Sequence, residues 1–196
     1  MKPALLLSTL ALLALATTHT PRSFAANDEP SAGRDETAGR GRSLLDSALE
    51  IGTQYCVGVP NSLGAPADLE IFGNPDPAVD AVALHVTGLP TGSYGVFLTS
   101  RFATFLPAPL GSSGNVCVRR DLGRFLEPGQ VKRAGLLGTI TLDTTLGEWT
   151  TQAIPRSVGI YAAAGGGRSH FQLWYRDNVG GVATSNFSDG EFVDWQ

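Results

Sequence analysis

The feature that most constrains the fold is the regular placement of turn-forming residues between positions 51 and 196. Short apolar or alternating runs, rich in Val, Ile, Thr and aromatic residues, are separated by stretches such as GNPDP, GLPTGS and LEPGQ. Gly, Pro and Asn favour turns, and runs of this length are typical of strands. We predict strands at residues 54–59, 68–72, 81–87, 94–99, 115–118, 138–142, 158–162, 171–176 and 191–195.

This pattern predicts an all-β domain. No long run with a helical period and no internal repeat is present in residues 51–196. Many short strands with frequent turns indicate an antiparallel β-sandwich, either Ig-like or jelly-roll-like. A segment of this length fits one domain and buries enough surface for a substantial core. We therefore expect one β-sandwich domain at 51–196.

The first fifty residues have a different character. Lys2 precedes an uncharged apolar run at 4–16, and small residues follow at positions 23, 25 and 26. This order is typical of a secretory signal peptide, and cleavage is expected after Ala25. A retained membrane anchor is the alternative, but the run is shorter than the roughly 20 residues of a spanning helix. We expect a signal peptide at 1–25, a secreted, extracytoplasmic mature chain, and no membrane span in it.

Residues 26–50 are predicted to form a polar spacer. The stretch NDEPSAGRDETAGRGR is built of charged and small residues and contains no large apolar side chain. Such a composition buries too little apolar surface to offset the entropy of ordering, so the spacer is predicted to be disordered. A short helix is expected at 43–50, with Ser43 as its N-cap and Asp46 three residues later.

The charge pattern disfavours a nucleic-acid partner. The formal net charge is −4 at pH 7, and the densest basic stretch, residues 119–133, is interrupted by Asp121 and Glu127. Nucleic-acid-binding domains carry a basic excess gathered on one face. We expect no nucleic-acid partner.

Cys56 and Cys117 each lie inside a predicted strand. In an exported chain, an even pair of cysteines indicates a disulfide. The alternative is a redox-active or nucleophilic cysteine, but neither residue has a CxxC partner or an adjacent His. We predict one disulfide, Cys56–Cys117.

Motifs for catalysis are absent from the sequence. The chain contains neither G-x-S-x-G nor a phosphate-binding glycine loop, and His85 and His170 have no zinc-ligand spacing. A glycosidase needs only two suitably spaced carboxylates. Most of the available carboxylates stand beside Gly, Pro or Asn, where they are typical turn residues. The sequence therefore favours a non-enzymatic role, with an extracellular hydrolase as a distant alternative.

The segment FQLWYRD carries the best candidate binding surface. Side chains alternate between the two faces of a strand, so Phe171, Leu173 and Tyr175 are predicted to face the core. The opposite face carries Gln172, Trp174 and Arg176. Carbohydrate is commonly bound by exposed aromatic faces and planar polar groups, which makes this second face a candidate ligand platform. Simple covering of the sheet is the alternative.

The connection predicted after this strand, NVGGVATSNFSDG, offers oxygen ligands for calcium. Ca²⁺ prefers hard oxygen ligands supplied by loops. The candidate ligands are Asp177, Asn178, Asn186 and Asp189. In the alternative, these side chains bond to nearby backbone, as Asp and Asn often do in turns. No cofactor other than calcium is expected.

Several local motifs together resemble a known family. The motifs are YCVGVPNSLGAPA at 55–67, GNVCV around Cys117, GRFLEPGQV at 123–131, then FQLWYRD and TSNFSDG. In this order they are similar to an uncharacterised domain found at the C-terminal end of secreted planctomycete-type bacterial proteins. The resemblance implies an extracellular β domain with a bridge between its two cysteines, and it implies no activity.

Two functional hypotheses follow from the sequence. The first is a non-catalytic binding or adhesion module of the cell exterior, with an extracellular polysaccharide or a surface protein as its partner. The second is a structural or assembly component of a surface complex. The predicted secretion, the predicted disulfide and the absence of convergent catalytic residues suit both hypotheses.

Overall fold

The structure is a computed structural model, and it describes residues 49–196. The predicted signal peptide, most of the spacer and residues 43–48 of the expected short helix lie outside the described residues. Glu50 forms an isolated antiparallel bridge with Phe72. The last two residues of the expected helix, 49 and 50, are therefore not helical, because strand β2 offers the backbone of Glu50 a partner.

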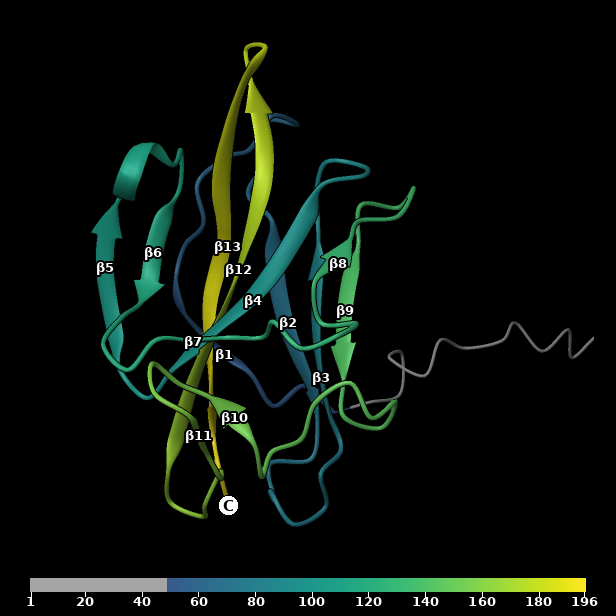
Figure 1. Cartoon of the computed structure of the whole chain (residues 1–196), viewed down its shortest axis with the longest axis vertical. Coiled ribbons are helices and arrows are strands. Elements are labelled where there is room, and N and C mark those ends of the chain that lie inside the picture. Colours follow the sequence, from purple (N-terminus) through teal and green to yellow (C-terminus); the bar gives the residue numbers. More distant parts are fainter. Residues whose placement is uncertain (1–48) are drawn as a thin grey trace, which may run out of the picture. The chain divides into compact units, whose positions relative to one another are not determined.

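The strands form two main antiparallel sheets (Figure 1). The larger, six-stranded sheet has the order β1-β13-β12-β4-β7, and β8 also pairs with β4. Its strands are β1 (Thr53–Cys56), β13 (Val182–Asp194), β12 (Arg168–Val179), β4 (Tyr94–Ser100), β7 (Gly123–Arg124) and β8 (Lys132–Arg133). The smaller sheet has the order β2-β3-β9, with β2 (Asp68–Gly73), β3 (Val82–Thr87) and β9 (Ile140–Asp143).

Two further pairs of strands complete the domain. They are β5 (Ala103–Pro107) with β6 (Asn115–Val118), and β10 (Ile154–Pro155) with β11 (Ile160–Tyr161). A 3₁₀ turn, η2 (Pro109–Gly111), lies between β5 and β6. Every predicted run overlaps an observed strand, whereas β5, β7, β8 and β10 were not predicted. The all-β antiparallel fold is thus confirmed.

The main core lies between the two sheets. Leu69, Leu84 and Leu142 from the smaller sheet join Phe97 and residues of β12 in one buried apolar cluster. The β12 contribution is Phe171, Leu173 and Tyr175, all fully buried. The predicted alternation of this strand is therefore confirmed on its core side.

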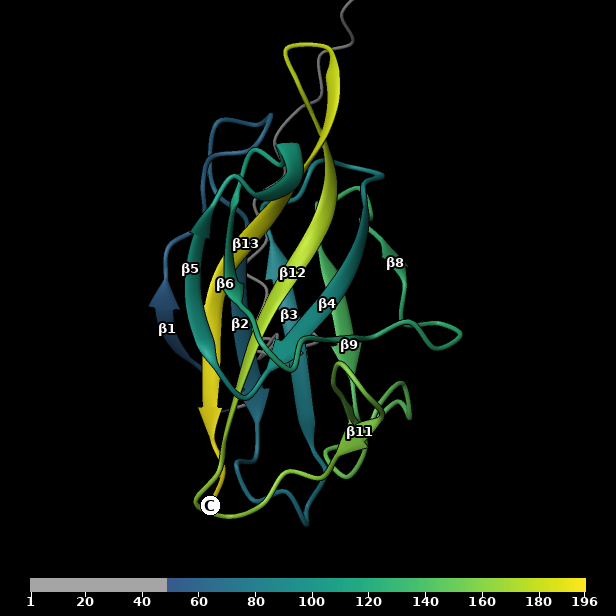
Figure 2. The same cartoon turned by 60° about the vertical axis from the view of Figure 1, so that its left-hand side comes forward.

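The opposite face of the larger sheet is covered by the β5–β6 hairpin, which lies across β12 and β13 in Figure 2. A second apolar cluster forms beneath it, from Val96 and Leu98 of β4, Val118 of β6 and Phe187 of β13. Trp174 packs against this cluster. The larger sheet therefore has apolar residues on both faces.

Strands β12 and β13 are much longer than predicted. The stretch expected to be a connection is the end of a two-stranded hairpin in which Val179 pairs with Val182. Gly180 and Gly181 form its two-residue turn with φ angles of 60° and 83°. Two-residue hairpin turns favour glycine because both positions take positive φ, and this geometry matches the twist of the strands. The loop prediction failed because the polar residues on both sides of this turn continue the ladder.

Candidate binding pocket

The floor of the pocket is a row of side chains on the outer face of the larger sheet. Trp174 is paired directly with Val96 on β4 and with Phe187 on β13. A bulge in β13 follows Phe187, so that Gln172 pairs with Gly190. One extra residue in a strand redirects the side chains on either side of it. The row formed by Val96, Trp174 and Phe187 is apolar across three strands. Trp174 is half-buried and lies at its centre.

The walls come from the segments on both sides of this row. Val116, Pro109 and Leu110 line one side, from the β5–β6 hairpin and its 3₁₀ turn, and Leu122 and Leu126 line the other. Together they enclose a cavity of about 430 Å³. Cavities of a few hundred cubic ångströms with mostly apolar walls are typical small-molecule sites.

The polar groups of the lining are few. Ser112 is already bonded, because its hydroxyl donates to the Ser185 carbonyl at 2.7 Å and accepts from the Gly114 N–H at 3.2 Å. Arg124 is the charged residue of the lining and is exposed. It follows that the lining offers one strong, charged donor beside an apolar surface.

Trp174 and Arg176 lie together, as the sequence predicted for this face. The guanidinium carbon of Arg176 is 5.1 Å from the centroid of the Trp174 ring, within cation–π range. Arg176 is exposed and Trp174 lines the cavity. Within residues 49–196, the side chains of Arg124 and Arg176 make no ion pair.

Gln172, the third residue of the predicted platform, is not available at the surface. It is fully buried beneath the hairpin. Its Oε1 accepts from the Cys117 N–H, and its Nε2 donates to the carbonyls of Asn115 and Ser188, each at 2.9 Å. The platform prediction was wrong for Gln172, because the β5–β6 hairpin covers this end of β12 and uses its amide.

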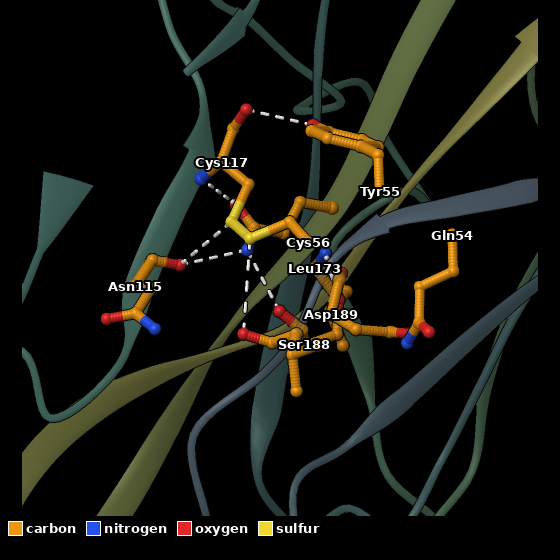
Figure 3. The surroundings of a disulfide bond; sticks show 10 residues. Gln54, Tyr55, Cys56, Asn115, Cys117, Leu173, Ser188 and Asp189 are labelled. Atoms are coloured by element: carbon orange, nitrogen blue, oxygen red, sulfur yellow. Dashed lines mark hydrogen bonds between the residues drawn. A yellow bond between two sulfur atoms is a disulfide. The ribbon is translucent and has the colours of Figure 1, made fainter. Parts of the chain in front are cut away.

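The disulfide holds the same hairpin. Cys56 on β1 is bonded to Cys117 on β6, with their Cα atoms 6.3 Å apart, which confirms the predicted bridge (Figure 3). The Tyr55 hydroxyl donates to the Cys117 carbonyl at 2.8 Å. Burial raises the pKa of Tyr55, so this hydroxyl keeps its proton and remains a donor. The wall of the pocket is therefore attached to the sheet by a covalent bond as well as by hydrogen bonds.

The rim of the pocket at η2 has an unusual backbone. Ala108 and Leu110 both take left-handed conformations, with φ angles of 42° and 53°. The Leu110 side chain is fully exposed. Non-glycine residues in this region are strained and persist only where the surroundings impose the conformation. Here the surroundings are bonds to β13, including the Ser113 N–H to Ser185 carbonyl bond at 2.8 Å.

The predicted calcium ligands Asp177, Asn178, Asn186 and Asp189 all lie on strands β12 and β13. Asn178 is exposed, and the side chains of the other three already have protein partners. The Asp177 carboxylate accepts from the Ser62 N–H at 3.1 Å, and that of Asp189 accepts from the Leu69 N–H at 2.6 Å. The Asn186 amide donates to the carbonyls of residues 59 and 60. These side chains fix the segment between β1 and β2 to the long hairpin.

The two histidines and the carboxylates form no metal cluster in the described part of the chain. The His85 ring is 2.8 Å from the Thr141 hydroxyl, and the His170 ring is 3.3 Å from the Ser100 carbonyl. Burial lowers the pKa of both rings, which favours their neutral forms. Each histidine therefore serves a local structural contact.

Comparison with known proteins gives no match to any family model, curated protein or solved structure. No helix within residues 49–196 is long and apolar enough to cross a membrane.

Sequence reasoning found Trp174 and the neighbouring Arg176 but missed the other residues that line the pocket. Leu122, Arg124 and Leu126 follow β6 in a stretch whose pairing the sequence did not predict. The sequence pattern that could have identified them is the alternation in DLGRFLEP. Phe125 packs in the core, and its two neighbours, Arg124 and Leu126, line the pocket. The alternation can be recognised in the sequence, but it does not predict that β4 and β12 are neighbouring strands.

Proposed function

We propose that this chain is a non-catalytic binding module of the cell exterior, and that its ligand occupies the pocket beside Trp174. The observation that carries the proposal is the apolar cavity itself, whose floor includes the half-buried Trp174 and whose edge carries Arg124, which makes no ion pair within residues 49–196. Aromatic residues combined with a few polar groups are typical of ligand pockets. The disulfide supports a location outside the cytoplasm, where such bonds persist.

The rigidity of the pocket supports the same proposal. The hairpin wall is fixed by the disulfide, by Gln172 and by Tyr55, and the rim is bonded to β13. A preformed site loses little conformational entropy when its ligand binds. Since the site is fixed before the ligand arrives, the domain suits recognition without a conformational step.

The test compares Trp174→Ala with Tyr94→Ala. Tyr94 is a matched control, because it is an exposed aromatic residue on β4 with Arg133 over its ring at 5.8 Å, and it does not line the cavity. Retention would be measured on a panel of insoluble polysaccharides, and fluorescence titrations would use the amphipathic anionic dye 1-anilinonaphthalene-8-sulfonate. We expect Trp174→Ala alone to weaken binding, by about tenfold or more. The absence of any Trp174-dependent binding in both assays would refute the proposal.

A second candidate function, assembly with a surface protein, is favoured by one observation. Phe105 and Leu106 of β5, Val57 beyond β1, and Leu110 of η2 are all exposed apolar residues on or near the hairpin. Exposed apolar residues that gather in one region mark interaction surfaces. Co-purification with envelope fractions, lost in a Phe105→Ser variant that retains Trp174-dependent binding, would identify this function instead.

A further inference from the structure

We infer that the pocket is specific for a small amphipathic anion, an alkyl or aryl chain that ends in a carboxylate; this inference rests on the proposed function. The floor and both walls are formed mainly by aliphatic and aromatic side chains. Apolar surface of this kind is favourably removed from water by a hydrocarbon, whereas the many hydroxyl groups of a sugar need polar partners. The body of the ligand is therefore a hydrocarbon.

The charged end of the ligand is determined by the arginines. Arg124 lies in the lining opposite Leu98, its cross-strand partner on β4. Arg176 adds a second positive charge over the Trp174 ring. Neither side chain has a carboxylate partner among residues 49–196. An arginine fork matches the geometry of a carboxylate and binds it through two parallel hydrogen bonds.

Other charged groups do not oppose this assignment. Among residues 49–196, no Asp or Glu lines the pocket. Asp121, Glu148 and Asp189, whose carboxylates are paired or buried, lie outside the lining. The hydroxyl of Ser112 is occupied by Ser185 and Gly114. A cationic ligand would meet Arg124 without a compensating carboxylate, and a neutral one would form no charge-assisted bond with that exposed guanidinium. The chemistry of the lining thus selects an anion.

Three probes with the same ten-carbon hydrocarbon chain separate these cases: decanoate, decanol and decyltrimethylammonium. The two ionic probes are used below their micelle-forming concentrations and decanol below its solubility limit. Trp174 provides the signal, because Trp149 and Trp195 are buried in the core at 6% and 3% exposure. We expect decanoate to change the Trp fluorescence with the highest affinity and the cation to bind most weakly. The Trp174→Phe variant keeps the pocket apolar but removes the fluorophore. If the fluorescence change reports this site, the variant should lose that change while calorimetry still detects decanoate binding.

The decisive variant is Arg124→Met, with Arg133→Met as the matched control. Arg124→Met should lower the affinity for decanoate about tenfold or more and leave that for decanol unchanged, because charge-assisted hydrogen bonds are lost only with the anion. Arg133→Met should change neither affinity. Circular dichroism and the melting temperature confirm that each variant folds.

The outcomes distinguish the two proposals. Equal binding of the three probes, or a decanoate affinity unaffected by Arg124→Met, overturns the anion assignment and leaves the pocket as a binding site. Trp174-dependent retention on a polysaccharide with no binding of any probe also overturns the anion assignment while the binding function stands. If neither polysaccharides nor probes bind in a Trp174-dependent way, both proposals fail.

Discussion

Glu191 lies on β13, is 4% exposed, and has a carboxylate oxygen, Oε2, without a hydrogen-bond partner in the described part of the chain. Burial is the main reason that its pKa is raised, and the nearby carboxyls of Asp189 and Glu50 add to the effect, which brings it to about 8. A Cβ at Gly52 would collide with Oε2, so a larger side chain at that position would displace the Glu191 carboxyl group. Glu191 is therefore protonated in the folded domain at neutral pH.

This placement predicts an unusual pH dependence of stability. The unfolded chain releases the Glu191 proton near pH 4.5, whereas the folded domain holds it until about pH 8. The free energy of unfolding should therefore fall as the pH rises through this window. Glu191→Gln should remove most of the slope and increase stability at pH 7 by about 2–3 kcal/mol. Urea unfolding at pH 5, 7 and 8.5 measures both effects.

The control for this experiment is Glu127→Gln, the same chemical change at an exposed site. It should leave the slope as it is in the parent protein. Asp189, whose pKa burial raises to about 6, should maintain a smaller decline between about pH 4 and pH 6 in both variants. An unaltered slope in Glu191→Gln would show that the buried carboxyl does not govern the pH dependence.

Asp80 shows the opposite arrangement, a carboxylate that is fully bonded. It accepts from the Thr151 N–H at 2.8 Å, from the Thr151 hydroxyl at 2.9 Å and from the Thr150 hydroxyl at 2.5 Å. Burial raises its pKa, but these hydrogen bonds together outweigh burial, and the net pKa is lowered. Its φ angle of 49° is in the left-handed region, which Asp and Asn tolerate better than most residues.

Two substitutions separate the roles of Asp80. Asp80→Asn keeps the backbone preference but removes the charge, and we expect a loss of about 1–2 kcal/mol. Asp80→Ala removes all three bonds as well as the tolerance of positive φ, so the loss should reach about 2–4 kcal/mol. Since the folded pKa is lowered, the contribution of Asp80 should disappear as the pH falls below about 4. Thermal melts at pH 7 and pH 3 measure these differences, and equal losses in the two variants at pH 7 would contradict the explanation.

At the scale of elements, the β5–β6 hairpin is the part that depends most on a few contacts. Its attachment to the larger sheet includes the Cys56–Cys117 bond (Figure 3), the Gln172 amide bonds, a few further hydrogen bonds and a small apolar cluster. The strand β5 itself is almost entirely exposed. The loss of any one of these contacts should therefore loosen the wall of the pocket before it affects the main core.

The disulfide is predicted to be the strongest of these contacts. It closes a loop with a sequence separation of 61 residues. Replacement by Cys56→Ser with Cys117→Ser should lower the free energy of unfolding by about 4 kcal/mol, through the added entropy of the unfolded chain. Trp174 emission should shift to longer wavelength, because the hairpin no longer shields the ring. A stability loss without that shift would mean that the hairpin stays in place without the bond.

The individual strands show where sequence reasoning succeeds and where it fails. The regular alternation of VALHVT and FQLWYR correctly predicted strands and, for the latter, the core-facing side. The segment 177–190 was taken for a loop, because its Asp, Asn and Ser residues are typical of turns. They lie instead in a long hairpin whose polar side chains bond to the backbone of residues 59–69. Contacts so distant in sequence leave no local pattern.

At the scale of the whole domain, the sandwich class and its disulfide were predictable, whereas the pocket was not. Turn spacing determines that strands form, and paired cysteines indicate a bridge. The pocket depends on β4, β12 and β13 being neighbours and on a hairpin that lies across them. Trp174 was singled out because its strand alternates, but the position of Arg124 depends on pairing between β7 and β4. Pairing of this kind is a property of the topology and is not encoded in any short stretch.

The pairing of β1 with β13 has a consequence for the order of folding. Among the strands of residues 49–196, β1 pairs with β13 alone, so this edge forms only when residues 182–194 are present. Domains dominated by such distant pairings fold slowly, within milliseconds to seconds, because the intervening chain must be ordered before the contact forms. Cys56 lies at the end of β1 and is aligned with Cys117 only once this edge exists. We therefore expect oxidation of the native pair to follow completion of the sheet, which thiol trapping during refolding would measure.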